Sequence, residues 1–365
     1  MKVLFFVHTY GEKNGISLHI KSLIGNFDKN CQACKLPMGQ NPSNLQVDGK
    51  LPKDIEASVI SGGSISLPLF SSLKLPISEF FKAMSSDFDI IHIHGYGNFH
   101  SFFGAILSIL KNKPLVWTIH GYPHIHGARR AFYYVYRYLM APLIFLKAKK
   151  IISVSTNVMP ILRRETGKEI YFIPNGVDLG KFHAKAGYRA AKFACYVGRL
   201  DPDKGVFRML ECKSLPIKFI GPDEDGTKAS LVAEAKRQGM KAPVFEESSF
   251  EGMPAAYESC RYVVLPSKYE GFPMSMLESL AMERPFICTD VGEVKATLSN
   301  LLDGPSQYIL DGNLESKLAA LEKTDLSGAL NAARQKLATY SWDSVAKRTS
   351  EIYFDALGGK KNAGK

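Results

Sequence analysis

Short apolar segments that end at glycine, proline or histidine recur along this chain, and a helical pattern follows each of them. Met1–Val7 is apolar on both of its alternating faces, which is typical of a strand buried inside a parallel sheet. The same layout returns at Asp87–His94, Leu115–His120, Phe193–Gly198 and Tyr262–Pro266. Strands that alternate with helices predict an α/β fold.

The chain is too long for a single hydrophobic core. Its 365 residues predict two domains. Composition loosens at Leu179–Lys192, where apolar periodicity is lost, so we place the linker there. The expected units are 1–180, 193–340 and a terminal segment, 341–365, that combines a helix with a flexible tail.

The positive charge is concentrated in the first half of the chain. Residues 1–180 contain 20 Lys and Arg against 11 Asp and Glu, and the formal net charge of the whole chain is +11. A basic domain suits an anionic partner, namely a membrane surface, a phosphorylated acceptor or a nucleic acid.

The cysteines and the apolar segments indicate the compartment. Six cysteines are scattered, which is typical of reduced intracellular thiols, and Cys31 and Cys34 form one isolated CxxC. Val3–Val7 is shorter than the core of a signal peptide, and no segment approaches the roughly 20 apolar residues of a spanning helix. We therefore expect a cytoplasmic protein, with contact to a membrane surface left open.

Two carboxylates mark the region after the strand Tyr262–Pro266. Glu270 lies in the loop, and Glu278 lies in a helix that we expect Pro273 to open. Three apolar residues define the buried stripe that contains Glu278: Met274, Leu277 and Ala281. A buried carboxylate needs donors, which ribose and sugar hydroxyls supply. The pair predicts a nucleotide-sugar site. The alternative is a helix-terminal Glu270 and a Glu278 that snorkels to solvent or meets an arginine.

A second strand–loop–helix unit carries cations. Arg199 and Lys204 are five positions apart after Phe193–Gly198, and both suit a diphosphate, although a solvated basic loop is the alternative. Gly221 ends the next strand in a glycine loop, and we predict that it helps to bind the nucleotide sugar. Gly15 lies just before the first helix, where phosphates commonly bind. The chain contains no P-loop motif and no G-x-G-x-x-G after its first strand, which disfavours P-loop proteins and dinucleotide oxidoreductases.

Histidines follow two strands of the first domain. His92 and His94 share one face of their strand, and His120 ends the next strand. Because ligands in open α/β sheets bind at the carboxyl ends of strands, His94 and His120 are predicted to line a binding site, with Tyr96 and Tyr122 at its rim. Core or capping histidines are the alternative.

A metal site would recruit His124 and His126 as well. No acidic or thiol partner lies near them in the sequence, so we expect no metal.

Ala128–Lys150 is predicted to be one helix, rich in aromatic residues and basic at both ends. Arg129 and Arg130 lie near its start, and Lys149 and Lys150 end it. The pattern fits a helix that lies on an anionic membrane, and equally a core helix with solvated basic ends.

The order of these segments resembles the GT-B glycosyltransferases and, within them, glycosyltransferase family 4. The similarity is strongest in four segments: Gly198–Gly205, Leu265–Glu278 with its Glu270-x7-Glu278, Ile173–Asp178 and Ser341–Asp343. The resemblance covers nearly the whole chain. It implies two Rossmann-like domains that face a cleft, with the acceptor on 1–180, the nucleotide sugar on 193–340, and a last helix that crosses back to the first domain.

The resemblance also implies roles for residues of the second domain. Arg199 and Lys204 would neutralise the donor diphosphate, Glu278 would bind the ribose hydroxyls, and Glu270 would meet the transferred sugar. Charge that develops on the leaving oxygen would then be stabilised without a metal. We expect front-face attack, in which the departing phosphate takes the acceptor proton.

The remaining implied contacts come from backbone and one histidine. The amides around Gly271, Phe272 and Pro273 would orient sugar and phosphate, Gly15 would let backbone approach the diphosphate, and His120 would line the reacting sugar. The resemblance therefore implies a retaining, metal-independent hexosyltransferase that uses a UDP- or GDP-sugar and no further cofactor. Its acceptor would be a glycan or a lipid-linked sugar, and nucleic acid is no partner.

Two other functions fit the same sequence. A nucleotide-sugar epimerase or hydrolase would share the fold and would replace the acceptor by an internal group or by water. A non-catalytic protein that binds a nucleotide sugar or a membrane comes from another class.

Overall fold

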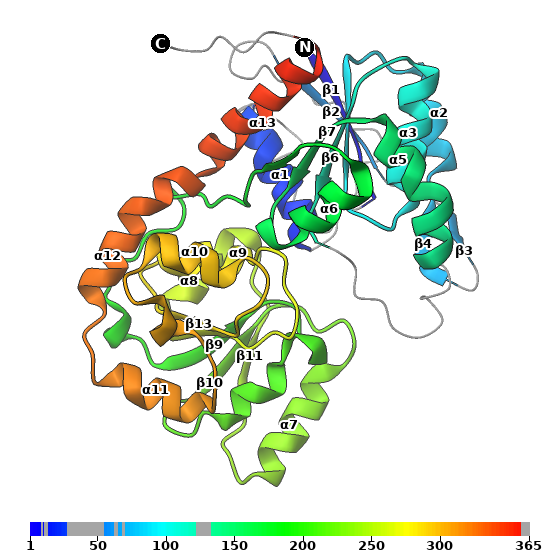
Figure 1. Ribbon diagram of the computed structural model, residues 1–365. Coiled ribbons are helices and arrows are strands. Elements are labelled where there is room, and N and C mark those ends of the chain that lie inside the picture. The colour runs from blue at the N-terminus through cyan, green and yellow to red at the C-terminus, as the bar shows by residue number, and fades with distance from the viewer. Residues whose placement is uncertain are drawn as a thin grey trace, which may run out of the picture. The chain divides into compact units, whose positions relative to one another are not determined.

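The chain forms two compact units, which are described separately (Figure 1). The computed structural model describes residues 1–8, 10, 14–27, 55–61, 65–67, 70–121 and 133–358. The first unit combines Met1–Gly176 with Trp342–Lys365, and the second is Val177–Ser341. The segment expected to be a linker, Leu179–Lys192, thus belongs to the second unit, where Tyr188 is buried.

A six-stranded parallel sheet forms the centre of the first unit. Its strands run in the order β2-β1-β5-β6-β7-β8. Their bounds are Lys2–Phe6 (β1), Glu56–Ile60 (β2), Ile90–His94 (β5), Leu115–Ile119 (β6), Ala148–Ser153 (β7) and Ile170–Phe172 (β8). A separate antiparallel pair is formed by β3 (Ile65–Leu67) and β4 (Phe70–Leu75). The inner strands β5 and β6 are buried along their whole length, as strands covered on both faces must be.

Helices cover both faces of this sheet. They are α1 (Gly15–Phe27), α2 (Ile77–Ser85), α3 (Phe99–Leu110), α5 (Ala141–Lys147), the 3-10 helix η3 (Thr156–Val158), α6 (Met159–Thr166) and α13 (Trp342–Ala356). Figure 1 shows α1 and α13 on one face and α2, α3 and α5 on the other. The start of α3 is fixed by Asn98, whose Oδ1 accepts a hydrogen bond from the Ser101 amide at 2.8 Å.

The prediction of one helix over Ala128–Lys150 is wrong at its end. A π-helix, η2 (Tyr136–Met140), continues into α5, and the chain is already in strand β7 from Ala148. Lys150 lies in β7, where its Nζ meets Asp355 of α13 at 2.6 Å and the two isoleucines that follow it are buried in the sheet. Arg129 and Arg130 lie outside the described residues.

The second unit is built on a five-stranded parallel sheet in the order β11-β10-β9-β12-β13. The strands are β9 (Phe193–Val197), β10 (Ile217–Ile220), β11 (Val244–Glu246), β12 (Cys260–Leu265) and β13 (Phe286–Cys288). Strand β9 is the first of the unit along the chain and has β10 on one side and β12 on the other. The strand order therefore reverses beside β9, and a ligand crevice is expected at the carboxyl end of such a reversal.

Helices again connect these strands. The α-helices are α7 (Thr227–Arg237), α8 (Met253–Glu258), α9 (Met274–Ala281), α10 (Val294–Leu301), α11 (Leu314–Glu322) and α12 (Ser327–Lys336). The 3-10 helices are η4 (Tyr188–Ala190), η5 (Pro202–Lys204), η6 (Val206–Glu211), η7 (Phe250–Gly252), η8 (Pro305–Tyr308) and η9 (Leu337–Tyr340). Pro273 precedes α9 as its N-cap residue and is not its first helical residue. Met274 is only half buried, whereas the helix from Met276 to Ala281 is buried all round.

The last helix, α13, returns to the first unit as expected and packs against α1, β6 and β7. Its first residue, Trp342, is buried and fills the space where a side chain at Gly176 would lie. Within the part of the chain that the structure describes, no helix is both long and apolar enough to cross a membrane.

Candidate active site

Two loops of the second unit meet at the carboxyl ends of β9 and β12. The loop after β9 leads through η5 to Gly205, and the loop after β12 runs from Pro266 to Pro273. The Lys268 amide donates to the Asp203 carbonyl at 3.0 Å, which ties one loop to the other. This junction lies where the strand order reverses, and it gathers most of the residues that the sequence predicts to bind the donor.

An ion pair forms the centre of this junction. Lys204 Nζ lies 2.7 Å from Glu270 Oε1, so the structure brings together two predicted site residues. Ser267 Oγ donates to the same carboxylate oxygen at 2.8 Å, and sequence reasoning missed this residue. Its only signal in the sequence is its place directly after Pro266, the proline that follows β12. The pair is half-buried, with side-chain exposures of 30% for Lys204 and 12% for Glu270.

Glycines allow the loops to pack this closely. Gly205 has φ +67°, and a Cβ there would lie 2.0 Å from the Pro266 carbonyl oxygen. Gly221 has φ +146°, and its Cβ would lie 2.1 Å from the Gly198 carbonyl oxygen. Gly221 thus sets the spacing of two neighbouring loops; its contact with a donor stays a prediction.

Glu278 is a buried carboxyl in α9 with a neighbour that the sequence did not indicate. Tyr257 OH donates to Glu278 Oε2 at 2.8 Å, whereas the alternative interpretation had Glu278 snorkel to solvent or meet an arginine. Burial raises the pKa of Glu278 to about 7, and the Tyr257 hydrogen bond and the charge of Lys181 oppose this rise. Near neutral pH this carboxyl therefore exists in both protonation states, and a ligand hydroxyl that donates to it would favour the charged one.

Arg199 is held apart from the Lys204–Glu270 pair. Its guanidinium meets Asp201 at 2.8 Å and Glu224 at 3.5 Å, and its side chain is 48% exposed. Among the described residues, no hydrogen bond or ion pair joins it to Lys204 or Glu270. The two predicted cations therefore do not converge in this structure: Asp201 and Glu224, which the sequence did not single out, retain Arg199.

The segment Gly271–Pro273 presents backbone and not side chains. The Gly271 carbonyl accepts from the Glu293 amide at 3.0 Å, which fixes the loop before α9. The Phe272 ring is buried and packs at 6.3 Å from the Tyr340 ring. Pro273 is also buried, so only main-chain atoms of this segment suit the predicted contact with sugar and phosphate.

In the first unit, three histidines form a cluster at the carboxyl ends of β5 and β6. His94 Nδ1 and His120 Nε2 lie 3.0 Å apart, which joins the two predicted residues. His19 of α1 packs edge-on against His120, with ring centroids 4.8 Å apart, and its Nδ1 lies 2.8 Å from Asn175 Oδ1. His19 and Asn175 were not predicted as site residues from the sequence. The one signal for His19 in the sequence was its position four residues after Gly15, which begins α1 and was predicted to lie near the diphosphate.

Burial keeps this cluster neutral. It lowers the pKa of His19 to about 4 and holds the pKa values of His94 and His120 well below the usual range, because an imidazolium loses its hydration there. His92 is a core residue, since its two ring nitrogens meet Tyr353 OH at 2.6 Å and Thr118 Oγ1 at 2.7 Å.

The two tyrosines predicted at the rim of the binding site beside His94 and His120 have different outcomes. Tyr96 is buried and stacks on Trp117, with ring centroids 5.8 Å apart, so its placement at an exposed rim is wrong. Tyr122, His124 and His126 lie outside the described residues.

The histidine cluster also has the composition of a metal site. One nitrogen from each of His19, His94 and His120 lies within 4.8 Å of the others. Neutral imidazoles are zinc ligands. The contact between His94 and His120 already occupies one nitrogen of each ring, however, so an ion that used those nitrogens would have to break it.

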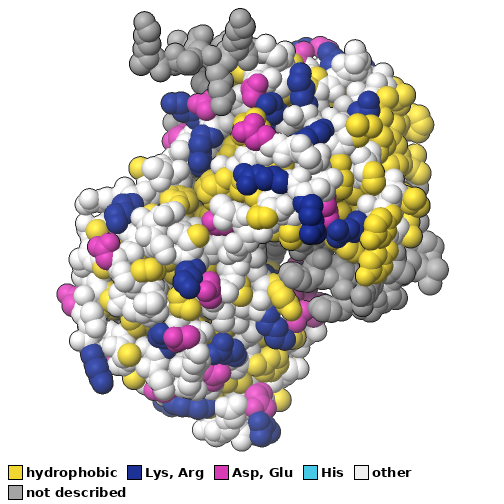
Figure 2. Space-filling model, viewed as in Figure 1, with side chains coloured by type: hydrophobic (Ala, Val, Ile, Leu, Met, Phe, Trp, Pro, Cys, Tyr) yellow, Lys and Arg dark blue, Asp and Glu magenta, His cyan; other side chains and the backbone are white. Residues whose placement is uncertain are grey.

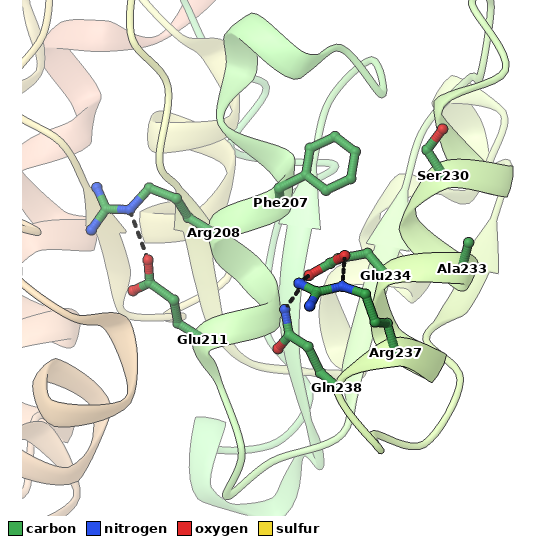
Figure 3. A pocket seen from close by; sticks show the side chains of 8 residues that line it. All are labelled: Phe207, Arg208, Glu211, Ser230, Ala233, Glu234, Arg237 and Gln238. Carbon is green, nitrogen blue, oxygen red and sulfur yellow. Dashed lines mark hydrogen bonds and ion pairs between the residues drawn. The ribbon is translucent and has the colours of Figure 1, made fainter.

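One pocket of the second unit lies away from this loop junction. A cavity of about 650 Å³ lies between η6 and α7 and contains none of the loop residues described above (Figure 3). Its charged groups pair with one another, Arg208 with Glu211 and Arg237 with Glu234. The cavity therefore offers no free charge for a diphosphate, and the loop junction remains the candidate site.

Family models match both units of the chain. The model for Glycosyltransferase Family 4 matches residues 43–181, and that for Glycosyl transferases group 1 matches residues 181–324. Together with the two parallel sheets and the loop junction, these matches show that the chain belongs to the family 4 and group 1 glycosyltransferases of the GT-B fold.

Individual relatives are distant. TuaC of Bacillus subtilis, a glycosyltransferase named for teichuronic acid biosynthesis, is 27% identical over 246 residues, which cover 61% of this chain and 57% of TuaC. A GDP-mannose:cellobiosyl-diphosphopolyprenol alpha-mannosyltransferase of Xanthomonas oryzae is 22% identical and covers 74% of this chain and 75% of its own length. The crystal structure of Anabaena HepE in complex with UDP and glucose matches with a TM-score of 0.72 at 16% identity, over 97% of this chain and all of HepE, which shows a common fold.

Proposed function

We propose that this glycosyltransferase is a retaining hexosyltransferase, which moves a sugar from a UDP- or GDP-sugar to a hydroxyl of a lipid-linked or glycan acceptor. The observation that carries the proposal is the Lys204–Glu270 pair beside the strand-order reversal. A cation next to a carboxylate suits a ligand in which a diphosphate adjoins sugar hydroxyls. Supporting evidence comes from HepE, which was solved with UDP and glucose, and from the Xanthomonas enzyme, which is named for GDP-mannose and a diphosphopolyprenol.

The proposed reaction breaks the bond between the sugar C1 and the diphosphate oxygen and forms one between C1 and the acceptor oxygen. Negative charge grows on the departing diphosphate, where Lys204 stabilises it; Arg199 joins only if it leaves Asp201 and Glu224. Positive charge grows on the sugar, where Glu270 favours it. The acceptor proton passes to the departing phosphate oxygen on the same face, so the configuration at C1 is retained.

Other residues position the substrates in this proposal. Glu278 binds the ribose hydroxyls in its ionised form, and Gly15 lets backbone approach the diphosphate. His120 lines the reacting sugar as a neutral ring, held by His94. No metal and no further cofactor takes part, because side-chain cations supply the positive charge.

We also propose a cytoplasmic location at the inner face of the membrane, where nucleotide sugars and lipid-linked acceptors meet. The free, buried cysteines of the described chain, Cys195, Cys212, Cys260 and Cys288, suit a reducing compartment.

Donor screening tests the proposal. The protein is incubated with UDP- and GDP-sugars, and both the melting temperature and released nucleotide are measured with and without lipid acceptors. We expect one donor class to raise the melting temperature and the acceptor to accelerate release. Nucleotide release at the same rate with and without acceptor would indicate a hydrolase. Conversion of the donor sugar into its epimer would indicate an epimerase, and a raised melting temperature without any turnover would indicate a binding protein. If no donor raised the melting temperature, the proposed enzymatic function would be contradicted.

A further inference from the structure

Exposed apolar side chains gather on one surface of the first unit. In the described chain, five large apolar side chains are more than half exposed, and all lie on α2, α3, η2 or α5: Phe81 68%, Leu110 58%, Tyr138 67%, Leu139 73% and Leu146 70%. We call these five residues the apolar face. Figure 2 shows hydrophobic side chains along the edge of the first unit where Figure 1 places α2, α3 and α5. No large apolar side chain described in the second unit is more than half exposed, so this surface is not an ordinary scatter of exposed residues.

The helices that carry the apolar face pack against one another and against the core of the first unit. α2 packs on α3, and α3 packs on α5. Tyr136 of η2 is buried against Tyr96, and Tyr138 and Leu139 of the same π-helix point outward. Tyr134 and Tyr138 stack with their rings 6.3 Å apart and 6° from parallel. Tyrosines that combine an apolar ring with a polar tip are typical of membrane–water interfaces.

Basic residues accompany this surface. Lys147 directly follows Leu146, and Lys149 is exposed two positions later. Arg163 and Arg164 are exposed on α6, which packs against α5. Residues 101–150 contain no Asp or Glu, and Glu165, the acid that follows Arg164 on α6, pairs with Arg137. Apolar side chains beside basic ones complement a surface of anionic headgroups over hydrocarbon.

We propose that the apolar face docks on an anionic lipid bilayer. Leu139 and Leu146 enter the boundary between headgroups and acyl chains, and Lys147 and Lys149 meet lipid phosphates. This inference deepens the proposed function, because it brings the acceptor domain to the surface where a lipid-linked acceptor lies. Membrane binding itself requires no turnover, so its test is independent of the donor and of the chemistry.

Vesicle sedimentation tests the docking. Full-length protein is mixed with vesicles of phosphatidylcholine alone or with phosphatidylglycerol added, at low and at high salt. We expect binding only to the anionic vesicles and a fall with salt. The double variant Leu139→Ser/Leu146→Ser should weaken binding more than tenfold, since each buried leucine contributes about a factor of ten or more. Lys147→Glu/Lys149→Glu should weaken it by about fivefold or more for each charge removed.

Matched variants keep the test decisive. Val232→Ser/Val244→Ser alters exposed apolar residues of the second unit, 38% and 43% exposed, and should bind as the wild type does. All variants should keep the circular dichroism spectrum and melting temperature, because the altered side chains are exposed. Wild-type protein that ignores anionic vesicles, or leucine variants that bind as tightly, would overturn the proposal. So would a dimer in sedimentation velocity that the leucine variants abolish, because the face would then be covered by a second copy.

Discussion

Lys204 Nζ lies 2.7 Å from Glu270 Oε1, although 66 positions separate the two residues in the chain. Lys204 ends the short helix η5, and Glu270 precedes α9, so the pair exists only because β9 and β12 are neighbours in the sheet. The distance therefore reports how the sheet order assembles a charged site from two separate loops.

Lys204→Ala should reduce transfer by about 10²- to 10³-fold, the usual effect of removing one group that stabilises the charge of a transition state. Its unfolding midpoint should change little, because Ser267 still donates to Glu270. Lys268→Ala is the matched control, since Lys268 lies in the same loop and its pairing with Asp203 is solvent-exposed. Steady-state kinetics measure both variants. Equal turnover in the two would disprove the role of Lys204.

Donor affinity should rise with pH around pH 7. Ribose hydroxyls that donate to Glu278 favour its ionised form, and the pKa of this carboxyl is raised to about 7. We expect a UDP- or GDP-sugar to bind roughly three- to tenfold more tightly at pH 8 than at pH 6. Calorimetry with the intact sugar nucleotide is suitable, because its diphosphate has no free terminal group that titrates in this range. Glu278→Gln should flatten the dependence; an equally steep slope in that variant would assign the effect elsewhere.

The same carboxyl should make unfolding depend on pH. Its pKa is higher in the folded protein, about 7, than the ordinary value of 4.5, so the folded state holds the proton more tightly. Stability should therefore fall as pH rises from about 4.5 to about 7, by at most about 3 kcal/mol. Urea unfolding of Glu278→Gln should show a smaller fall over this window, and a variant that loses as much as the wild type would contradict the assignment.

Gly205→Ala should separate the two site loops. Gly205 and Gly239 have nearly the same φ, +67° and +68°, so a side chain strains both backbones by about 1–2 kcal/mol. A Cβ at Gly239 meets nothing within 4 Å, whereas one at Gly205 would lie 2.0 Å from the Pro266 carbonyl oxygen. Urea unfolding should therefore show a larger loss for Gly205→Ala, and only this variant should lose transfer. Similar losses of both stability and transfer in the two variants would show that the close approach is unimportant.

Removal of metal ions should leave transfer unchanged. The imidazoles of His19, His94 and His120 are near enough to share an ion, but the contact between His94 and His120 competes with its binding. We expect protein dialysed against EDTA to keep the activity of untreated protein. The prediction would be contradicted if EDTA abolished transfer and added zinc restored it in the wild type but not in His19→Ala.

The sequence predicted much of the fold because burial leaves a periodic signal. The predicted segments Asp87–His94, Leu115–His120 and Phe193–Gly198 contain β5, β6 and β9, and the loops after β9 and β12 were recognised from apolar segments that end at glycine or proline. The join between α5 and β7 was misplaced, since Ala148 and Ile151 suit either a helix or a strand.

The partners of the site residues could not be predicted in the same way. Tyr257 donates to Glu278 across 21 positions, and Asn175 meets His19 across 156 positions. Such contacts depend on which elements become neighbours, and no periodicity in either segment records that. The partners of Arg199 were also not predicted. Its positive charge suggested that it binds a diphosphate, but in the folded protein it pairs with Asp201 and Glu224.

The position of α13 has a consequence for how the protein is made. The second unit is one continuous stretch, whereas the first is completed only when Trp342–Ala356 packs against α1 and the sheet, with Tyr353 OH 2.6 Å from His92 Nδ1. The ribosome must therefore finish the whole second unit before the first can close. A chain that ends before α13 lacks the helix that packs on α1, β6 and β7, so the first unit closes only after the chain has been synthesised through α13.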